Sequence, residues 1–178
     1  MTAILKVDEI QDTSGNLIIK EDSNTITIGA SGDTTNIVGT LQNNGSAFGK
    51  IGQVLNSTTT VDTSSSSDVE LFNLSITPSS TSSKILAIVG VTAQLDANEY
   101  TDFDLYRGTL ASGTKVFDGA NNLFNSADII RVGYSFTYLD SPSTTSATQY
   151  TVVGAPQFGT IRFGAGGRQS ITLMEVLA

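Results

Sequence analysis

Short segments in which apolar and polar positions alternate recur through most of the chain. Residues 68–77 follow this pattern, with Val69 and Leu71 on one face. Phe72 and Leu74 fall on the other face. A period of two residues is typical of a β-strand, whose successive side chains point to opposite faces, so this segment is predicted to be a strand.

Residues 84–95 show a different pattern, because they are apolar over much of their length. A continuous apolar run fits a strand that is buried on both faces, and it also fits a helix. The β-branched residues Ile88, Val89 and Val91 favour the strand.

Further strand candidates follow, separated by Gly, Pro, Asn and Ser residues that are typical of turns. They are residues 101–107, 115–117, 128–139, 149–153, 159–163 and 169–177. The glycine-rich residues 164–168 are predicted to form a hairpin turn, since they lack the helix and the lysine of a phosphate-binding loop. Short strands at this spacing predict an all-β fold with a jelly-roll β-sandwich.

Two of these strands have more apolar surface than a single strand usually buries. One row in residues 128–139 is wholly apolar or aromatic and predicts a core face: Ile130, Val132, Tyr134, Phe136 and Tyr138. In the last strand, Ile171 and Leu173 lie on one face, and Met174 and Val176 make the other face apolar too. Such a strand lies either inside the domain or at a subunit interface, and we favour the interface.

The aromatic residues divide the chain into two parts. Phe48 is the only one among the first 50 residues, whereas the other seven Phe and all five Tyr lie at Phe72 or beyond. Aromatic side chains supply much of the buried area of a core, so the N-terminal part is predicted to lack a globular core of its own. The turn residues at 42–46 separate a segment of residues 1–45 from a domain of residues 46–178.

The N-terminal segment contains short β-branched runs at residues 17–19, 26–28 and 37–38. Strands this short do not bury their apolar faces within one chain. Identical strands of a symmetric oligomer would cover them, so we predict a homotrimer with an intertwined β shaft. The predicted trimer-interface residues are Ile26, Ile28, Ile37 and Val38 in the shaft, with Met174 and Val176 in the C-terminal domain. The alternative is a three-stranded meander folded against the C-terminal domain.

An apolar tip precedes these runs at the N-terminus. It is better suited to docking on another protein than to facing water. The predicted docking residues are Ile4, Leu5, Val7 and Ile10.

Composition excludes several classes of chemistry. The chain contains no Cys, His or Trp, so thiol and imidazole catalysis and ordinary zinc or haem sites are not expected. Its net charge of −8 argues against nucleic acid as a partner. The sequence also has no run of 18 apolar residues and no signal-peptide pattern, so we expect a soluble, unsecreted protein without a membrane span.

Acidic residues gather at Asp96, Glu99, Asp102 and Asp104. Oxygen ligands in one loop can bind calcium, but the spacing does not match the twelve-residue calcium-binding loop. The same residues could supply a glycosidase pair of carboxylates, although nothing specifies a substrate groove. We therefore expect no catalytic residue, no cofactor and no metal site. The tyrosines nearby, Tyr100 and Tyr106, could stack on a sugar or pack at an interface.

Residues 7–16, 24–29 and 32–41 resemble the N-terminal region of short fibre-type virion proteins of marine and freshwater tailed bacteriophages. Residues 53–55 and 76–86 are also similar to those proteins. The resemblance implies a trimeric protein of the phage particle that is anchored by its N-terminal part and exposes a C-terminal knob. Residues 103–108 and the last strand are similar to trimeric jelly rolls of the tumour necrosis factor type.

Together these features predict a homotrimeric capsid decoration protein at the virion surface, either a cement protein or a short head fibre. Its partners would be other copies of itself and phage capsid or tail proteins. The alternative is a receptor-binding protein at the tip of a tail fibre that recognises a host surface glycan. An enzyme that degrades host polysaccharide is the least favoured interpretation.

Overall fold

The computed structural model describes residues 9–11, 13–14, 17–22, 25–28, 32, 34, 42–43, 46–47, 51–119 and 123–177. The chain divides into two compact units, Met1–Phe48 and Gly49–Ala178. All regular elements among the described residues are β-strands, as the sequence predicted. No helix in this part of the chain is long and apolar enough to cross a membrane.

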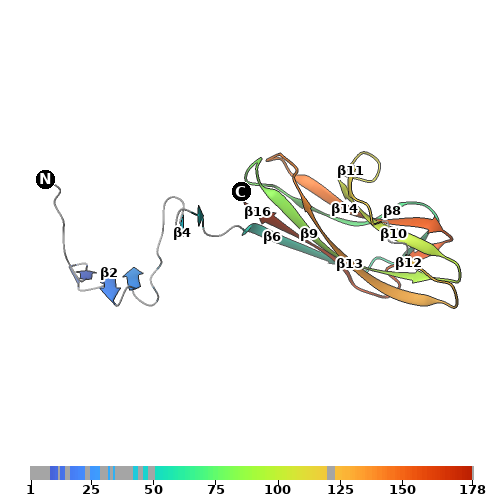
Figure 1. The fold of residues 1–178 in the computed structure, drawn as a ribbon, viewed down its shortest axis with the longest axis horizontal. Helices are drawn as coiled ribbons and strands as arrows, with labels where there is room; N and C mark the ends of the chain where they lie inside the picture. The colour runs from blue at the N-terminus through green and yellow to red at the C-terminus, as the bar shows by residue number, and fades with distance from the viewer. Residues whose placement is uncertain are drawn as a thin grey trace. The chain divides into compact units, whose positions relative to one another are not determined.

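The second unit is a sandwich of two antiparallel sheets (Figure 1). The six-stranded sheet contains β6 (Ile51–Thr59), β16 (Gln169–Val176), β9 (Lys84–Leu95), β13 (Ile130–Asp140), β15 (Ile161–Phe163) and β7 (Thr63–Ser65). The five-stranded sheet contains β8 (Val69–Ile76), β14 (Thr148–Phe158), β10 (Tyr100–Arg107), β11 (Thr114–Phe117) and β12 (Leu123–Phe124).

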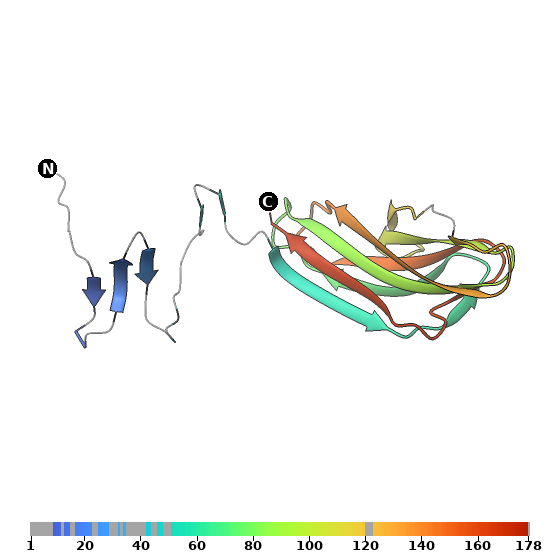
Figure 2. The ribbon, with the colours of Figure 1, turned by 60° about the horizontal axis from the view of Figure 1, so that its bottom comes forward.

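The long strands alternate between the two sheets along the chain. Strands β6, β9, β13 and β16 belong to the first sheet, and β8, β10 and β14 belong to the second. Figure 2 shows β6, β16, β9 and β13 side by side in the first sheet. This crossing between two antiparallel sheets is a jelly-roll arrangement, which confirms the predicted fold class.

The core lies between the inner faces of the two sheets. Phe103 of β10 meets the ring of Phe163 of β15 edge-on at 5.6 Å between ring centroids. Phe117 of β11 stacks on Phe136 of β13 at 4.5 Å. The predicted core row in β13 is confirmed for the residues that pack on this cluster: Val132, Tyr134, Phe136 and Tyr138. Ile130, at the start of the row, is exposed instead.

Two expectations about individual strands were wrong. Strand β8 does not alternate strictly, because the register with β14 shifts between Val152 and Val153. Leu71 and Phe72 therefore both contact the core, as neighbours do at a β-bulge. Strand β9 is buried on one face only, since Ile88 is 40% exposed on the other.

In the second unit, the sequence pattern missed β6, β7 and the two-residue β12. Strand β6 has polar residues at most inward positions and only Leu55 packed on the core, so its apolar signal is weak. Strand β7 is rich in serine and has no apolar signal, and its pairing with β15 makes it a strand.

The first unit contains an antiparallel meander of β1 (Glu9–Gln11), β2 (Leu17–Asp22) and β3 (Thr25–Ile28). Ile10 lies opposite Ile19, which lies opposite Ile28, so the three form one row across the sheet. A short pair, β4 (Gln42–Asn43) and β5 (Ser46–Ala47), occupies the segment expected as a linker. The intertwined shaft stays a prediction, because it concerns several copies of the chain.

We expect Gly154→Ala to destabilise the second unit by about 1–3 kcal/mol, as overpacking of a core does. A Cβ at Gly154 would lie 2.5 Å from Cζ of the buried Phe163. Denaturant unfolding measures the change. The shorter side chain of Phe163→Leu makes room, so Gly154→Ala should cost less in that background. Equal costs in the two backgrounds would contradict this packing.

Candidate functional site

The outer face of the six-stranded sheet is the strongest candidate for a functional surface. Its outward positions follow from the alternation of burial along each strand. We call the following residues the uncharged face: Val54, Asn56 and Thr58 of β6; Ser170, Thr172, Met174 and Val176 of β16; Leu86, Ile88, Gly90 and Thr92 of β9; and Gly133, Ser135, Thr137 and Leu139 of β13. None of them is ionisable at neutral pH.

Strand register gathers four of the large apolar side chains of this face into one row. Met174 lies opposite Val54 on one side and opposite Leu86 on the other, and Leu86 lies opposite Leu139. The row thus crosses four strands without a polar residue. Val54 is 53% exposed and Leu139 is 46% exposed, so both ends of the row lie at the surface of the single chain.

The next row combines an apolar residue with polar groups that are partly paired. Thr172 lies opposite Asn56 and opposite Ile88. The Asn56 amide donates a hydrogen bond to Oγ1 of Thr172 at 2.9 Å and another to the Ile171 carbonyl at 3.2 Å. Polar groups that already have partners lose less free energy when a surface is buried. Covering this row with a partner therefore costs little desolvation free energy.

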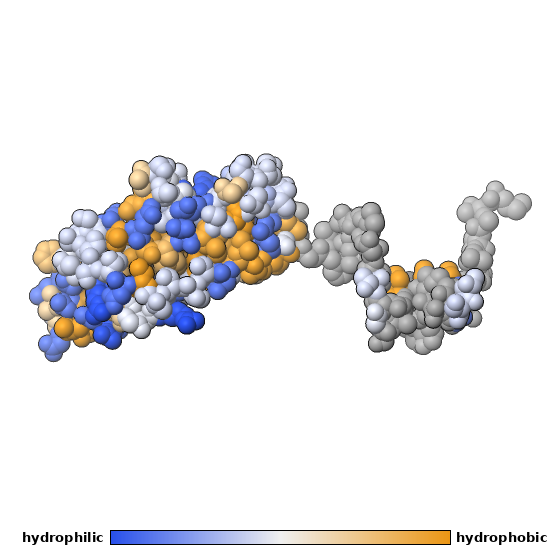
Figure 3. Space-filling view, turned by 180° about the vertical axis from the view of Figure 1, so that it is seen from behind, coloured by the Kyte–Doolittle hydropathy of each residue, from blue (hydrophilic) through white to orange (hydrophobic). Residues whose placement is uncertain are grey.

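Charged residues border the uncharged face but do not enter it. Lys84 begins β9 at one end, and Arg131 lies near the other end of β13. The Arg131 Nε group donates to Oε1 of Gln94 at 3.2 Å. Figure 3 shows one side of the second unit, on which apolar residues reach the surface between hydrophilic ones.

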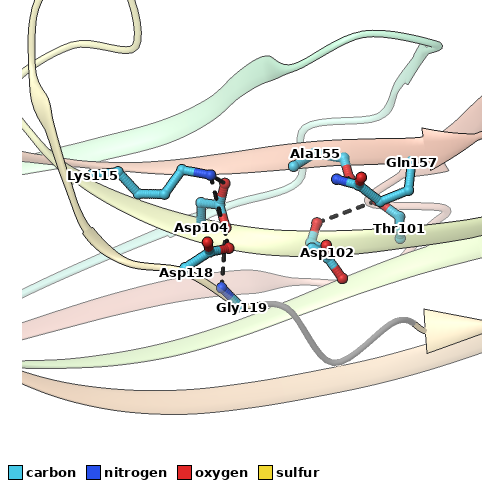
Figure 4. A network of polar contacts seen from close by, with 8 residues as sticks. All are labelled: Thr101, Asp102, Asp104, Lys115, Asp118, Gly119, Ala155 and Gln157. Carbon is cyan, nitrogen blue, oxygen red and sulfur yellow. Dashed lines mark hydrogen bonds and ion pairs between the residues drawn. The ribbon is translucent and has the colours of Figure 1, made fainter.

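The outer face of the five-stranded sheet differs, because ionisable residues lie within it and not only at its border. Asp104 of β10 is fully buried there beneath the segment that follows β11. Its carboxylate lies 2.6 Å from Nζ of Lys115 and accepts the Gly119 N–H at 3.0 Å (Figure 4). The hydrogen bond to Asp104 is the main cause of a raised Lys115 pKa. The two outer faces of the sandwich are therefore chemically distinct.

A buried carboxylate holds the end of β16 that carries Met174 and Val176. Glu175 points inward and is 1% exposed. It accepts hydrogen bonds from the N–H and the hydroxyl of Ser79, both at 2.6 Å, and from the Gln53 amide at 2.9 Å. Burial raises the pKa of Glu175, but these hydrogen bonds outweigh it and lower the pKa to about 2. The carboxylate thus ties β16 to β6 and to the loop between β8 and β9.

Two of the four acidic residues considered as calcium ligands, Glu99 and Asp104, have other partners. Both carboxylate oxygens of Glu99 accept hydrogen bonds from backbone N–H groups. The donors are Asp96 at 2.7 Å and Thr160 at 2.8 Å. Asp104 is paired with Lys115, as described above. Within the described residues, no group of three or more acidic side chains is placed to hold a metal ion.

The structure places the predicted interface residues as follows. Met174 and Val176 lie half-buried on the uncharged face. Ile28, in β3 with Ile26, is 53% exposed, and Ile10 in β1 is 38% exposed. The other predicted residues lie outside the described part of the chain: Ile4, Leu5, Val7, Ile37 and Val38.

Apart from Met174 and Val176, which were predicted, the uncharged face has four large apolar members, and sequence reasoning missed all four. The continuous apolar run at 84–95 contained a signal for Leu86 and Ile88, because it made both faces of that strand apolar. Val54 and Leu139 had no such signal, since each belongs to the row only through pairing with a distant strand.

No protein-family model and no curated protein matches the sequence. Similar solved structures include T=1 particles derived from infectious bursal virus, with 14% identity and a TM-score of 0.42. Another is the VP2 subviral particle of infectious bursal disease virus, with 15% identity and a TM-score of 0.40. A third is the Gt strain of that virus, with 13% identity and a TM-score of 0.41. All three matches cover 85% of this chain, and they cover 41%, 42% and 43% of the matched chains, respectively. This chain therefore spans less than half of the length of the chains that it matches. The jelly-roll assignment rests on the strand order, to which these likenesses add nothing.

We expect the stability of the protein to depend on the charge of Glu175. The folded-state pKa of about 2 lies below the ordinary value of 4.5, so the unfolded chain binds the proton more tightly. The stabilisation is therefore complete above about pH 5 and is lost as the pH falls toward 2. Glu175→Gln should destabilise the protein at pH 7 by about 1–3 kcal/mol and flatten this slope.

Denaturant unfolding at several pH values between 7 and 3 measures this effect. Ser79→Ala removes one donor and keeps the carboxylate, so its slope should lie between those of the wild type and Glu175→Gln. The same slope in the wild type and in Glu175→Gln would show that Glu175 has no such role.

Proposed function

We propose that the protein is a homotrimeric structural component of a bacteriophage particle, a capsid decoration protein of the cement or short head-fibre type. The second unit would form the exposed knob through contacts between uncharged faces. The first unit would dock on the particle. The role is structural rather than catalytic, and the protein lies at the virion surface.

The uncharged face is the observation that carries this proposal. Each chain has a net charge of −8, so two copies repel one another wherever their acidic residues meet. A face without charges removes that cost locally, and its apolar row gains free energy when it is buried. Val54, Ile88 and Leu139 remain exposed in one chain. Three copies around a threefold axis can each turn this face toward the axis and bury it against the other two, so we commit to self-association as a trimer.

The virion assignment is supported by the resemblance of the N-terminal residues to short fibre-type virion proteins. The first unit also has an exposed apolar row, formed by Ile10, Ile19 and Ile28. The second unit, by contrast, has a large core of its own. A small unit with an exposed apolar row, in the same chain as a stable domain, suits an anchor. Three anchors on one trimer strengthen binding by multivalency even when each contact is weak, and a ligand that binds only the assembled shell stabilises it.

Light scattering of the full-length protein tests the trimer. We expect a mass three times the 18.6 kDa of one chain. The double variant Leu86→Glu with Met174→Glu places charges in the centre of the uncharged face and should give monomers. Ser75→Glu adds a charge at an exposed position of β8, in the other sheet, and should leave the mass unchanged. A monomeric wild type would overturn the proposal.

Occupancy of the particle tests the anchor. In the virus that encodes this chain, Val7→Glu with Ile10→Glu should remove the protein from purified virions, because a charge in an apolar contact is costly to bury. The solution mass of this variant should stay that of the wild type. Unchanged occupancy would mean that the docking residues lie elsewhere. If virions without the protein no longer adsorbed to host cells, the receptor-binding alternative would replace the decoration role.

A further inference from the structure

Three aromatic rings form a row on the outer face of the five-stranded sheet. Tyr100 of β10 lies opposite Phe124 of β12 on one side and opposite Phe158 of β14 on the other. The Tyr100 and Phe158 rings are stacked with 6.3 Å between centroids, and the Phe124 ring meets Tyr100 edge-on at 6.4 Å. We call these three residues the aromatic row.

The aromatic row is exposed. Phe124 is 55% exposed and Phe158 is 61% exposed. The β-bulge between Tyr100 and Thr101 lets Phe158 lie beside Tyr100, because Pro156 is the partner of Thr101. Other aromatic pairs in the unit, such as Phe103 with Phe163, are buried in the core. The exposed row is therefore not a continuation of the core.

Hydrogen bonds fix the residues that adjoin all three rings. Glu99, which precedes Tyr100, accepts the Thr160 N–H at its carboxylate, two residues after Phe158. Its carbonyl accepts the Asn125 N–H at 3.0 Å, next to Phe124.

Asn125 is itself buried, and its side-chain amide donates to the carbonyls of Leu95 and Asp96, each at 3.1 Å. Gly159, directly after Phe158, has a φ of +91°, and a Cβ there would lie 2.5 Å from the Glu99 side chain. The backbone that carries the rings is thus held in place before any ligand arrives, which lowers the entropy lost on binding.

The chemistry of the row favours a neutral sugar ring. The faces of aromatic rings are electron-rich, and the C–H groups on one side of a pyranose present a flat, weakly positive surface to them. Nucleic-acid bases also stack on aromatic side chains, but their binding requires positive charge, and this chain carries −8. The row lies in the other sheet from the uncharged face, so self-association there leaves it accessible.

We propose that the aromatic row Phe124, Tyr100 and Phe158 is a carbohydrate-binding site that stacks on the C–H face of a neutral pyranose. This goes beyond the structural role proposed above and does not depend on it. The site would let the exposed knob hold on weakly to glycans of a cell surface. Several weak sites on one particle would add up by multivalency.

Saturation-transfer NMR on the full-length protein tests the proposal. The probes are methyl β-glucopyranoside, methyl β-galactopyranoside, methyl α-mannopyranoside and methyl N-acetyl-β-glucosaminide, with choline as a cationic competitor. We expect transfer to the ring C–H protons of at least one sugar. Phe124→Ala with Phe158→Ala should weaken its binding at least about tenfold. Tyr106→Leu changes another aromatic residue of β10, and should bind like the wild type.

Several outcomes would overturn the carbohydrate site: no transfer to any of the four sugars, equal binding by the double variant, or stronger binding of choline than of every sugar. A loss of the wild-type mass in the double variant would show that the row contacts another copy, and would overturn it too. If the double variant does not fold, titration of the wild type with the bound sugar replaces it. The ring protons of Phe124 and Phe158 must then shift, and shifts confined to other residues would contradict the site.

Discussion

A two-layer β-sandwich buries only one face of each sheet, and this constraint shapes the whole second unit. The inner faces meet in a core of Phe103, Phe163 and their neighbours. Each outer face is then left to solvent or to a partner. A strand that is apolar on both faces, such as β9 or β16, is stable in water only if something covers its outer side or if the exposed area stays small. The uncharged face is the direct result.

Charge is distributed unequally over the two outer faces. In the five-stranded sheet, buried Asp104 is neutralised by Lys115 and by the Gly119 N–H. In the six-stranded sheet, the buried carboxylate of Glu175 points inward to Ser79 and Gln53, so it adds no charge to the uncharged face, whose border carries Lys84 and Arg131. In a chain with a net charge of −8, contacts made through the uncharged face would bring copies together with less repulsion.

The two outer faces would then have separate tasks in one particle. Contacts between uncharged faces would join the copies, and the aromatic row in the other sheet would stay exposed to the surroundings. Glu99 and Asn125 hold that row with backbone hydrogen bonds, so its geometry does not depend on the assembly. Multivalency connects the two tasks, because assembly multiplies every weak site that the knob displays.

The sequence by itself determined the all-β class and the approximate position of most strands, because a two-residue period is a local property of a strand. It also indicated that the last strand is apolar on both faces, from Ile171 and Leu173 against Met174 and Val176. Only the tertiary structure decided which residues share a surface. Val54 and Met174 are 120 positions apart, and register alone places them opposite each other. The bulge in β8, the bonds of Glu175 and the aromatic row likewise join distant segments, and no local pattern contains that pairing.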